Sequence, residues 1–273
     1  MPKIHPTAVV SPEARLAQGV EIGPHCVIGS QVSLGEGTRL ISGVTVEGRT
    51  SIGSGCTLYP GVCIGFPPQV KGRTLEAPAV RIGNDNVLRE HATVHGASTP
   101  EGITVIGDRN YLMVNTHVAH DCVLGNDIVM ANAVVLGGHV IVEDGAVLGG
   151  VAGVHQFARV GRLVMLGAYT KLVTDAAPYS IVDGNPAAFY GANVVGLRRA
   201  GFKPEEVRAV RRALVTLLGT GRNLSLAQQE VRAELGQYEA VRNILEFVST
   251  SKRGVVRGAA GPDETPAAVE ETI

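Results

Sequence analysis

An aliphatic residue recurs at every sixth position along most of this 273-residue chain. The first unbroken run has eleven members: Ile4, Val10, Leu16, Ile22, Ile28, Leu34, Leu40, Val46, Ile52, Leu58 and Ile64. A period of six fits neither an α-helix nor an ordinary strand, but it is typical of hexapeptide β-helices. Three hexapeptides make one triangular coil of about 18 residues, with the aliphatic side chains inside the prism. The period therefore predicts a parallel β-helix.

The six-residue register breaks twice before it resumes. Residues 66–79 include three prolines and several polar residues, and residues 96–104 are also mostly small or polar. The repeat resumes at Ile82 and again at Ile106, and it ends near Pro178. We therefore predict a β-helix over residues 1–185 with loops at 65–80 and 96–105. Loops on a regular scaffold often lie at functional sites.

The periodicity becomes helical near Lys203, where Pro204 occupies the first turn. Residues 226–235 and 238–248 predict two more short helices, so 186–257 is interpreted as a small C-terminal helical domain. Residues 258–273 are rich in Gly, Ala, Pro and Glu, which predicts a disordered tail. Residues 196–257 contain 12 basic and 6 acidic side chains. This excess indicates either a solvated helical surface or a docking surface for an acidic partner.

The composition excludes several classes of protein. A net charge of −1 gives no global attraction to nucleic acid. The sequence has no run of about 18 apolar residues to span a membrane and no signal-peptide pattern. Its four cysteines form no Cys-x-x-Cys pair, and together these features predict a cytoplasmic protein.

A single prism has no deep cleft, so the grooves between packed prisms are the natural sites.

The histidines are concentrated in one part of the β-helix, with six of the eight between residues 91 and 155. Side chains 16–19 residues apart should lie on one wall of neighbouring coils, about 4.8 Å apart. This spacing predicts a ladder of His120, His139 and His155, with Asp121 next to His120. Such a cluster fits a zinc site with an open position. It also fits a general base whose tautomer is held by a carboxylate, which we favour.

Three motifs then resemble a known family: residues 115–122 (Asn-Thr-His-Val-Ala-His-Asp-Cys), 136–140 and 154–157. They resemble the acyl-carrier-protein–UDP-N-acetylglucosamine O-acyltransferases of lipid A biosynthesis. The resemblance covers residues 1 to about 257, including 191–193 and 196–202. It implies a left-handed coil, a homotrimer, and no metal or other cofactor. The implied substrates are UDP-N-acetylglucosamine and a (3-hydroxy)acyl chain on acyl carrier protein.

The resemblance also implies roles for individual residues. His120 matches the general base that deprotonates the sugar 3-hydroxyl, Asp121 the residue that orients it, and Gly138 the backbone oxyanion donor. Ala168 matches the residue that ends the acyl groove, which implies a chain of about ten to twelve carbons for coils spaced ~4.8 Å apart. The remaining matches are to substrate-contacting positions: Gln69, Lys71, His95, His117, His139, His155, Gln156, Asn193 and Arg199.

Three alternatives stay open at this point. A related hexapeptide N-acyltransferase would act on an amino-sugar nucleotide. A zinc-dependent β-helix enzyme of the carbonic anhydrase type would use the same histidines as ligands. A non-catalytic repeat scaffold would not need the clustered histidines at all.

Overall fold

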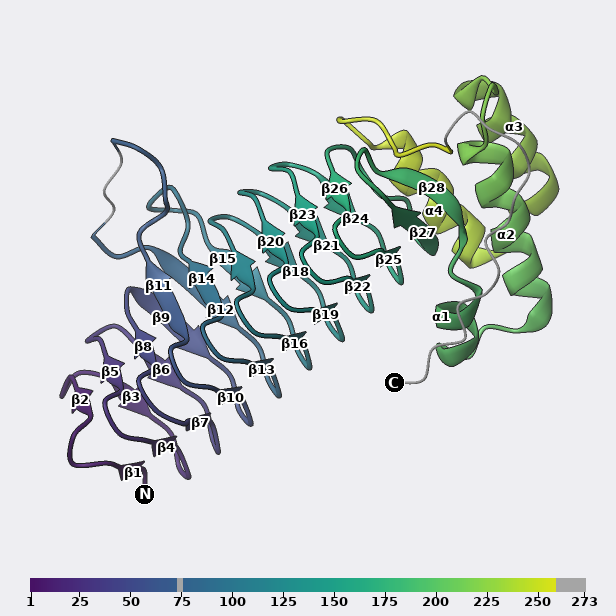
Figure 1. Cartoon of the computed structure of the whole chain (residues 1–273). Coiled ribbons are helices and arrows are strands. Elements are labelled where there is room, and N and C mark those ends of the chain that lie inside the picture. The colour runs from purple at the N-terminus through teal and green to yellow at the C-terminus, as the bar shows by residue number, and fades with distance from the viewer. Residues whose placement is uncertain (73–75, 259–273) are drawn as a thin grey trace.

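The chain folds into a long three-sided prism of short parallel strands, with helices at its C-terminal end (Figure 1). The computed structural model describes residues 1–72 and 76–258. Apart from Gly258, the tail predicted to be disordered lies outside the described residues, as does part of the first loop, 73–75. The predicted left-handed parallel β-helix is confirmed.

The three sides of the prism are sheets that we name A, B and C, and each takes every third strand. Sheet A contains β1 (Lys3–Ile4), β4 (Glu21–Ile22), β7 (Arg39–Leu40), β10 (Thr57–Leu58), β13 (Val87–Leu88), β16 (Tyr111–Leu112), β19 (Val129–Met130), β22 (Val147–Leu148), β25 (Met165–Leu166), β27 (Ser180–Asp183) and β28 (Ala188–Ala192). Sheet B contains β2 (Val9–Val10), β5 (Val27–Ile28), β8 (Thr45–Val46), β11 (Cys63–Phe66), β14 (Thr93–His95), β17 (His117–Val118), β20 (Val135–Leu136), β23 (Gly153–Val154) and β26 (Lys171–Leu172). Sheet C contains β3 (Arg15–Leu16), β6 (Ser33–Leu34), β9 (Arg49–Ile52), β12 (Ala79–Ile82), β15 (Thr104–Ile106), β18 (Val123–Leu124), β21 (Ile141–Val142) and β24 (Arg159–Val160).

The hexad aliphatics fill the prism as the sequence predicts. In a typical two-residue strand such as β20, the first side chain points outward and the second, Leu136, is buried. The residue before the strand, Val134, is buried beside it. Because neighbouring coils are 18 residues apart, Leu136 lies directly between Val118 and Val154. Removing these stacked side chains from water is the main stabilising contribution to the solenoid.

The corners of the prism have a backbone conformation that is unusual for residues other than glycine. Asp121, Asp127, Ala133 and His139 recur at intervals of six, all with φ near +60°. A side chain there costs roughly 1–2 kcal/mol relative to the right-handed conformation, which the surrounding ladder must offset. Functional side chains at these corners stand clear of the packed core, so the corners can be varied without disturbing the prism.

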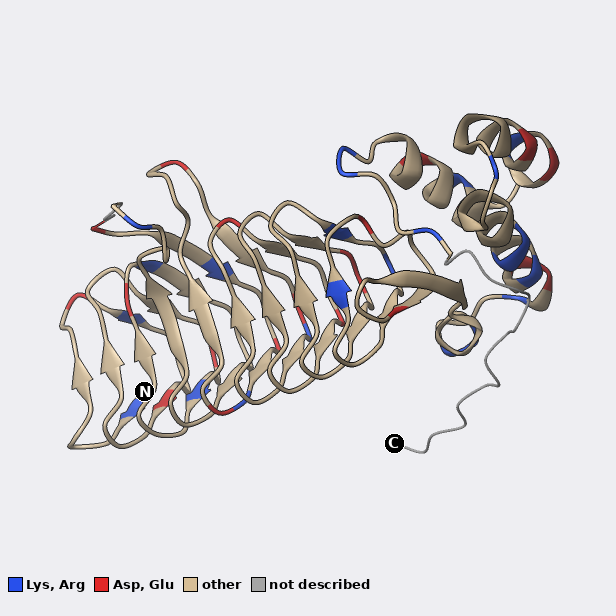
Figure 2. Ribbon diagram, turned by 45° about the horizontal axis from the view of Figure 1, so that its top comes forward, with Lys and Arg blue, Asp and Glu red and all other residues tan. Residues whose placement is uncertain are grey.

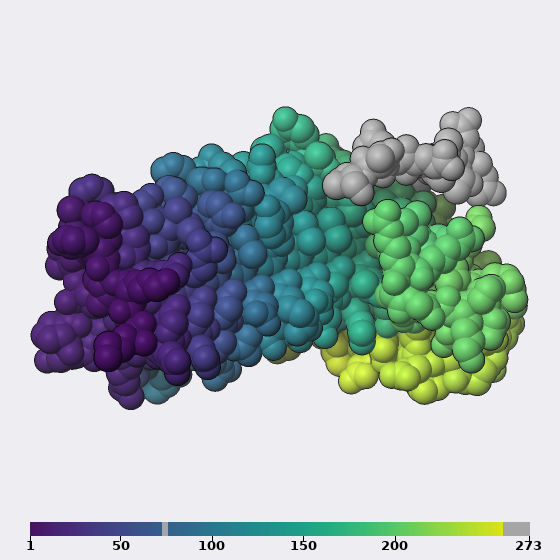
Figure 3. Space-filling view, turned by 90° about the horizontal axis from the view of Figure 1, so that it is seen from below, coloured from purple at the N-terminus to yellow at the C-terminus, as the bar shows by residue number. Residues whose placement is uncertain are grey.

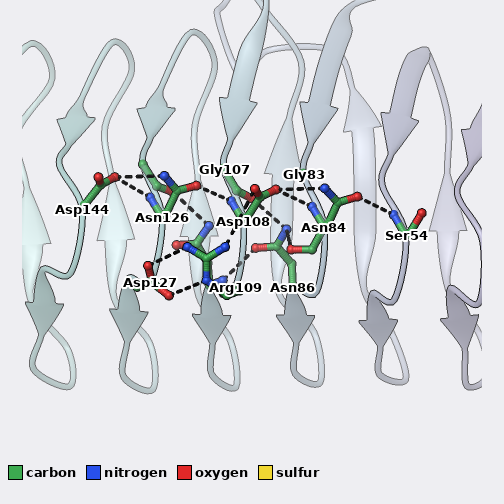
Figure 4. A network of polar contacts seen from close by, with 12 residues as sticks. Ser54, Gly83, Asn84, Asn86, Gly107, Asp108, Arg109, Asn126, Asp127 and Asp144 are labelled. Carbon is green, nitrogen blue, oxygen red and sulfur yellow. Dashed lines mark hydrogen bonds and ion pairs between the residues drawn. The ribbon is translucent and has the colours of Figure 1, made fainter.

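A ladder of amide and carboxylate side chains joins the coils at the corner between sheets C and A (Figure 4). The side-chain oxygen of Asn84 accepts the backbone N–H of Ser54, and Asp108 does the same for Asn84. Asn126 and Asp144 continue the ladder for two more coils. These bonds satisfy corner N–H groups that the strands leave without partners. They therefore fix the middle coils to one another at the corner between sheets C and A.

The C-terminal segment closes the last coil. After the antiparallel pair of β27 and β28 come four helices: α1 (Val194–Arg199), α2 (Pro204–Leu218), α3 (Leu224–Leu235) and α4 (Glu239–Ser249). The three predicted helices are confirmed, whereas α1 was not predicted. The helices pack at the end of the elongated molecule far from the N-terminus (Figure 3). The predicted domain boundary at residue 186 stays a prediction.

The cap is joined to the prism by a buried carboxylate. Asp175 accepts hydrogen bonds from the Arg159 backbone N–H and Nε, and the Arg159 guanidinium also bonds Phe247 O on α4.

In the described residues, no helix is long and apolar enough to cross a membrane.

Both loops leave the prism at the same corner, between sheets B and C. The first joins β11 to β12, and the second joins β14 to β15 in the next coil. They project side by side from the prism (Figures 1 and 2). Arg49 of β9 bonds backbone oxygens in both, Ala77 O and Pro100 O.

Candidate active site

The corner between sheets B and C brings together segments that are far apart in sequence. Coil by coil, it presents the first loop, the second loop, and then His120 and Asp121 between β17 and β18. The following two coils place Gly138 and His139, then Gln156 and Phe157, in equivalent positions. Both loops therefore lie next to the histidine cluster, where loops on a regular scaffold often carry function.

His120 and Asp121 face each other although they are adjacent in sequence. Asp121 has φ +60°, and this corner turns the two side chains to the same side. His120 Nδ1 lies 2.8 Å from Asp121 Oδ2. Burial pushes the pKa of Asp121 upward, but hydrogen bonds from Ser98 and His120 outweigh it and hold the pKa below its usual value. The carboxylate is therefore ionised at neutral pH and accepts the Nδ1–H of His120, so in the neutral imidazole Nε2 is the nitrogen that can accept a proton.

Gly138 lies directly against the ring of His120, one coil further along. A Cβ at residue 138 would be 2.5 Å from His120 Cε1 and 2.7 Å from Nε2, so any larger residue would force the ring to move. The neighbouring N–H groups of Gly137 and His139 donate to Val154 O and His120 O. Within residues 1–72 and 76–258, the Gly138 N–H has no protein acceptor. This N–H, in a residue that packs against the His120 ring, is therefore a candidate oxyanion donor.

His139 completes the corner, but the predicted ladder of three histidines is wrong. His139 lies edge-on to His120 with ring centroids 5.2 Å apart, and its other face stacks on Phe157 at 4.6 Å. Phe157 is the third ring because Asp121, His139 and Phe157 occupy the same corner position in successive coils. His155 lies two residues earlier, beside the end of β23, where its Nδ1 is 3.1 Å from Gln156 O.

A second pair of histidines lines the adjoining wall on sheet B. The rings of His95 and His117 meet edge-on at 5.1 Å, and Thr93 Oγ1 lies 2.8 Å from His117 Nδ1. Burial lowers the pKa of His117 to about 4, and the charges of His95 and His120 add to the effect. Burial, followed by the charge of His120, also lowers the pKa of His95. Both imidazoles are therefore neutral at physiological pH and act as hydrogen-bonding groups rather than cations.

A cavity of about 540 Å³ extends from these histidines across sheet B. Seven of the predicted site residues line it: Gln69, His95, His117, His120, Gly138, His155 and Gln156. Its far wall includes Lys171, which continues the outward column of His117, Val135 and Gly153. No Asp or Glu is among the described residues that line it. The cavity thus combines a polar end at His120 with an apolar floor.

The other predicted site residues lie outside the cavity lining. Asp121 and His139 are behind and beside His120, and Lys71 is exposed on the first loop. Ala168 is exposed at a different corner, between β25 and β26, which joins sheets A and B. Asn193 caps α1: its Oδ1 accepts the Gly196 N–H and its Nδ2 donates to Leu163 O. Arg199 is exposed in the last turn of α1.

Four residues at the site were not predicted: Thr93, Ser98, Thr104 and Phe157. Strand register identifies Thr93, since it is the in-register partner of His117. An 18-residue count from the corner position of Asp121 identifies Phe157. Ser98 lies in the second loop and Thr104 begins β15 at the end of that loop, and no sequence spacing indicates that they contact Asp121.

His120, Asp121 and His139 are also the group that the zinc alternative requires, with one donor atom from each within 4.8 Å of the others. The donor atoms of His120 and Asp121 are hydrogen-bonded to each other. The Ser98 N–H also donates to both oxygens of Asp121. This is the geometry of an imidazole base and its orienting carboxylate.

The fold and this corner together define a β-helical acyltransferase, and comparisons with known proteins agree. Residues 175–256 match the family model described as UDP N-acetylglucosamine O-acyltransferase, domain 2. The acyl-[acyl-carrier-protein]–UDP-N-acetylglucosamine O-acyltransferase of Alkalilimnicola ehrlichii is 47% identical over 94% of this chain and 100% of its own length. The enzyme of the same name from Thiobacillus denitrificans is 43% identical with the same coverage.

Solved structures show the same relationship. The UDP-N-acetylglucosamine acyltransferase of Francisella novicida has a TM-score of 0.91 and 33% identity, covering 98% of this chain and 100% of that chain. The Bacteroides fragilis protein has a TM-score of 0.90 and 34% identity, covering 93% and 100%. The chain therefore belongs to the family of acyl-[acyl-carrier-protein]–UDP-N-acetylglucosamine O-acyltransferases.

Proposed function

We propose that this protein transfers an acyl chain from acyl carrier protein to the 3-hydroxyl of UDP-N-acetylglucosamine, the first step of lipid A biosynthesis. The observation that supports it most is the contact of His120 with Asp121 on one side and Gly138 on the other. The names of the relatives state the acyl donor and the acceptor. An apolar cavity floor next to the base suits an acyl chain.

The geometry supports a general-base mechanism. Asp121 accepts the Nδ1–H of His120, so Nε2 can take the proton of the 3-hydroxyl as its oxygen attacks the thioester carbonyl. The resulting oxyanion accepts the Gly138 N–H. When the intermediate collapses, the carbon–sulfur bond breaks and the imidazolium returns its proton to the departing thiolate. The products are the sugar ester and the free thiol of the carrier.

The neutral pair of His95 and His117 supports this assignment. Two cations beside His120 would lower its affinity for the proton that it must take up. Because burial keeps His117 neutral, it can bond a substrate hydroxyl or amide without competing with the base. The hydrogen bond between Thr93 Oγ1 and His117 Nδ1 limits the rotation of the His117 ring.

The carrier protein has a candidate docking surface on the helices. Lys and Arg residues occur at several places along the C-terminal helices (Figure 2). Arg211 and Arg198 are exposed, whereas Arg212 pairs with Glu234 on α3. We assign this surface to an acidic acyl carrier protein, because electrostatic complementarity accelerates and orients association. The predicted homotrimer, in which Gln69 and Lys71 reach the site of a neighbouring copy, and the cytoplasmic location belong to the same proposal.

A transfer assay tests the proposal. Purified protein is incubated with UDP-N-acetylglucosamine and a series of acyl-carrier thioesters of increasing length, and the acylated sugar nucleotide is measured by mass spectrometry. We expect an ester product with a clear optimum in chain length. Product only from a 3-amino acceptor would favour the N-acyltransferase instead. Activity that chelation abolishes and zinc restores would favour the metal alternative.

A further inference from the structure

The second loop makes direct contact with the carboxylate that orients the base. The Ser98 backbone N–H donates to both oxygens of Asp121, at 3.1 Å to Oδ2 and 3.3 Å to Oδ1. The Asp121 N–H in turn donates to Thr104 Oγ1 at 2.8 Å. Thr104 is fully buried. The loop therefore contacts Asp121 through both its carboxylate and its backbone.

The loop is itself tied down at its base and its tip. The N–H groups of Gly96 and Ala97 donate to Phe66 O and Ala79 O, at the two ends of the first loop. The Arg49 guanidinium bonds Pro100 O near the tip of the second loop and Ala77 O in the first. A loop held at three points can fix the position of a side chain that it contacts, which a free loop cannot do.

Asp121 has a choice of partner that the loop can decide. Its Oδ2 lies 2.8 Å from His120 Nδ1 and 3.5 Å from His139 Nε2. A rotation of the carboxylate toward His139 would leave His120 without its orienting partner. We propose that the second loop, through the Ser98 N–H and the close approach of Gly102, holds the Asp121 carboxylate on His120. Ser98 and Gly102 are then positioning residues, and this assignment rests on the proposed function.

Gly102 provides the most direct test of that contact. A Cβ at residue 102 would be 2.9 Å from Asp121 Oδ1 and 3.0 Å from both Ala97 Cβ and Thr99 Oγ1. Gly102 has an ordinary backbone conformation, because it is absent from the positive-φ residues of the described chain. Of these three neighbours, the end of the Asp121 side chain is closest. Gly102→Ala should therefore move the carboxylate by a few tenths of an ångström and leave the prism intact.

The experiment measures steady-state transfer by Gly102→Ala, Ser98→Pro and Ser98→Ala, with Gly150→Ala as a matched control. The nearest atom to a Cβ at Gly150 is Asn132 O at 3.5 Å, an ordinary contact at the corner between sheets A and B. We expect Gly102→Ala to lower kcat about tenfold, since misplacement by about 1 Å costs about a hundredfold. Ser98→Pro removes the N–H and should lose about ten- to a hundredfold. Ser98→Ala keeps the N–H but removes the hydroxyl, which also helps to lower the Asp121 pKa, and should lose less than Ser98→Pro.

The pH profile separates positioning from general damage. A carboxylate bonded to an imidazole favours the protonated ring, so a misplaced Asp121 should shift the acid limb of kcat/KM to lower pH. The other groups that face His120, namely His95, His117 and His139, are the same in every variant. A variant that merely folds less well would lose rate without shifting the acid limb to lower pH. Ser98→Ala, which keeps the N–H, should shift the limb less than Ser98→Pro.

A second readout needs no activity. In substrate-free protein labelled with ¹⁵N-histidine, the Nδ1–H of His120 should be protected from exchange in the wild type and less protected in Gly102→Ala. If Gly102→Ala matches Gly150→Ala in rate, acid limb and exchange, the loop does not position Asp121. If Ser98→Pro does not fold, Gly102→Ala decides the question alone. An inactive wild type with intact protection would overturn the proposed function and leave the loop assignment standing.

Discussion

Replacing Gly138 with alanine tests whether the position of the His120 ring limits the rate. The substitution keeps the backbone N–H, so the proposed oxyanion donor remains. The new Cβ would lie 2.5 Å from His120 Cε1, whereas ordinary contact begins near 3.4 Å. The backbone of residue 138 is fixed by the Phe157 N–H, which donates to Gly138 O at 3.0 Å. The ring must therefore retreat by about 1 Å.

The expected loss follows from that displacement. A shift of about 1 Å in a catalytic group costs about a hundredfold in rate, equivalent to roughly 2.7 kcal/mol of transition-state stabilisation. The ring cannot move without lengthening its 2.8 Å bond to Asp121 or pressing on His139. The loss should appear mainly in kcat, because the substitution displaces the ring of the base.

The assay compares kcat of Gly138→Ala with that of Gly150→Ala at saturating substrates. Thermal unfolding of both variants reports whether the prism is intact. A kcat for Gly138→Ala within about threefold of the control, with an unchanged unfolding temperature, would show that the ring position is not limiting. The argument from the contact between Gly138 and His120 would then be wrong.

Three further predictions concern pH, the carrier protein and chain length. The pKa of folded His117, about 4, is below its ordinary value of about 6.5. Unfolding therefore takes up a proton between about pH 4 and 6.5, and stability is lost as pH falls through this range. His117→Asn should make Tm fall less steeply with pH, and an unchanged dependence of Tm on pH would contradict this. Arg211→Glu and added salt should both raise KM for the carrier substrate, whereas the control Arg39→Glu in the N-terminal coils should leave KM unchanged. If Arg211→Glu and salt leave KM as unchanged as the control does, docking at α2 is excluded. Ala168→Gly should shift the preferred acyl chain to a longer length and Ala168→Met to a shorter one. Lys171→Ala should lengthen the preferred chain if the cavity wall sets the limit. Competition between donors of different length measures the optimum, and an optimum that no substitution moves would exclude both residues as the limit on chain length.

The sequence predicts the prism well because its stability depends on a local rule. Leu136 is buried for the same reason as every hexad aliphatic, and three hexads per coil place it beside Val118 and Val154. The same count predicts that His120 and His139 are neighbours. The sequence also allows His120 and Asp121 to converge. Adjacent side chains point to opposite faces of a strand, so a contact between them requires a corner, and the hexad count places these two residues at one.

What the sequence does not predict depends on contacts that have no period. His155 was expected in the ladder because its spacing lies within the range of one coil, but the corner position belongs to Phe157. The contacts of Ser98 and Thr104 with Asp121 depend on the path of an irregular loop. Helix α1 is only six residues long and begins at the Asn193 cap, so its apolar pattern is too short to detect.

The rate of acyl transfer by His120→Ala tests the central claim most directly. The variant and the wild type are assayed with the same acyl-carrier thioester and UDP-N-acetylglucosamine, after their thermal unfolding has been shown to agree. Loss of a general base predicts a fall in turnover of about 10²–10⁴-fold. Turnover within a few-fold of the wild type, in a variant that unfolds at the same temperature, would contradict the assignment of His120 as the base.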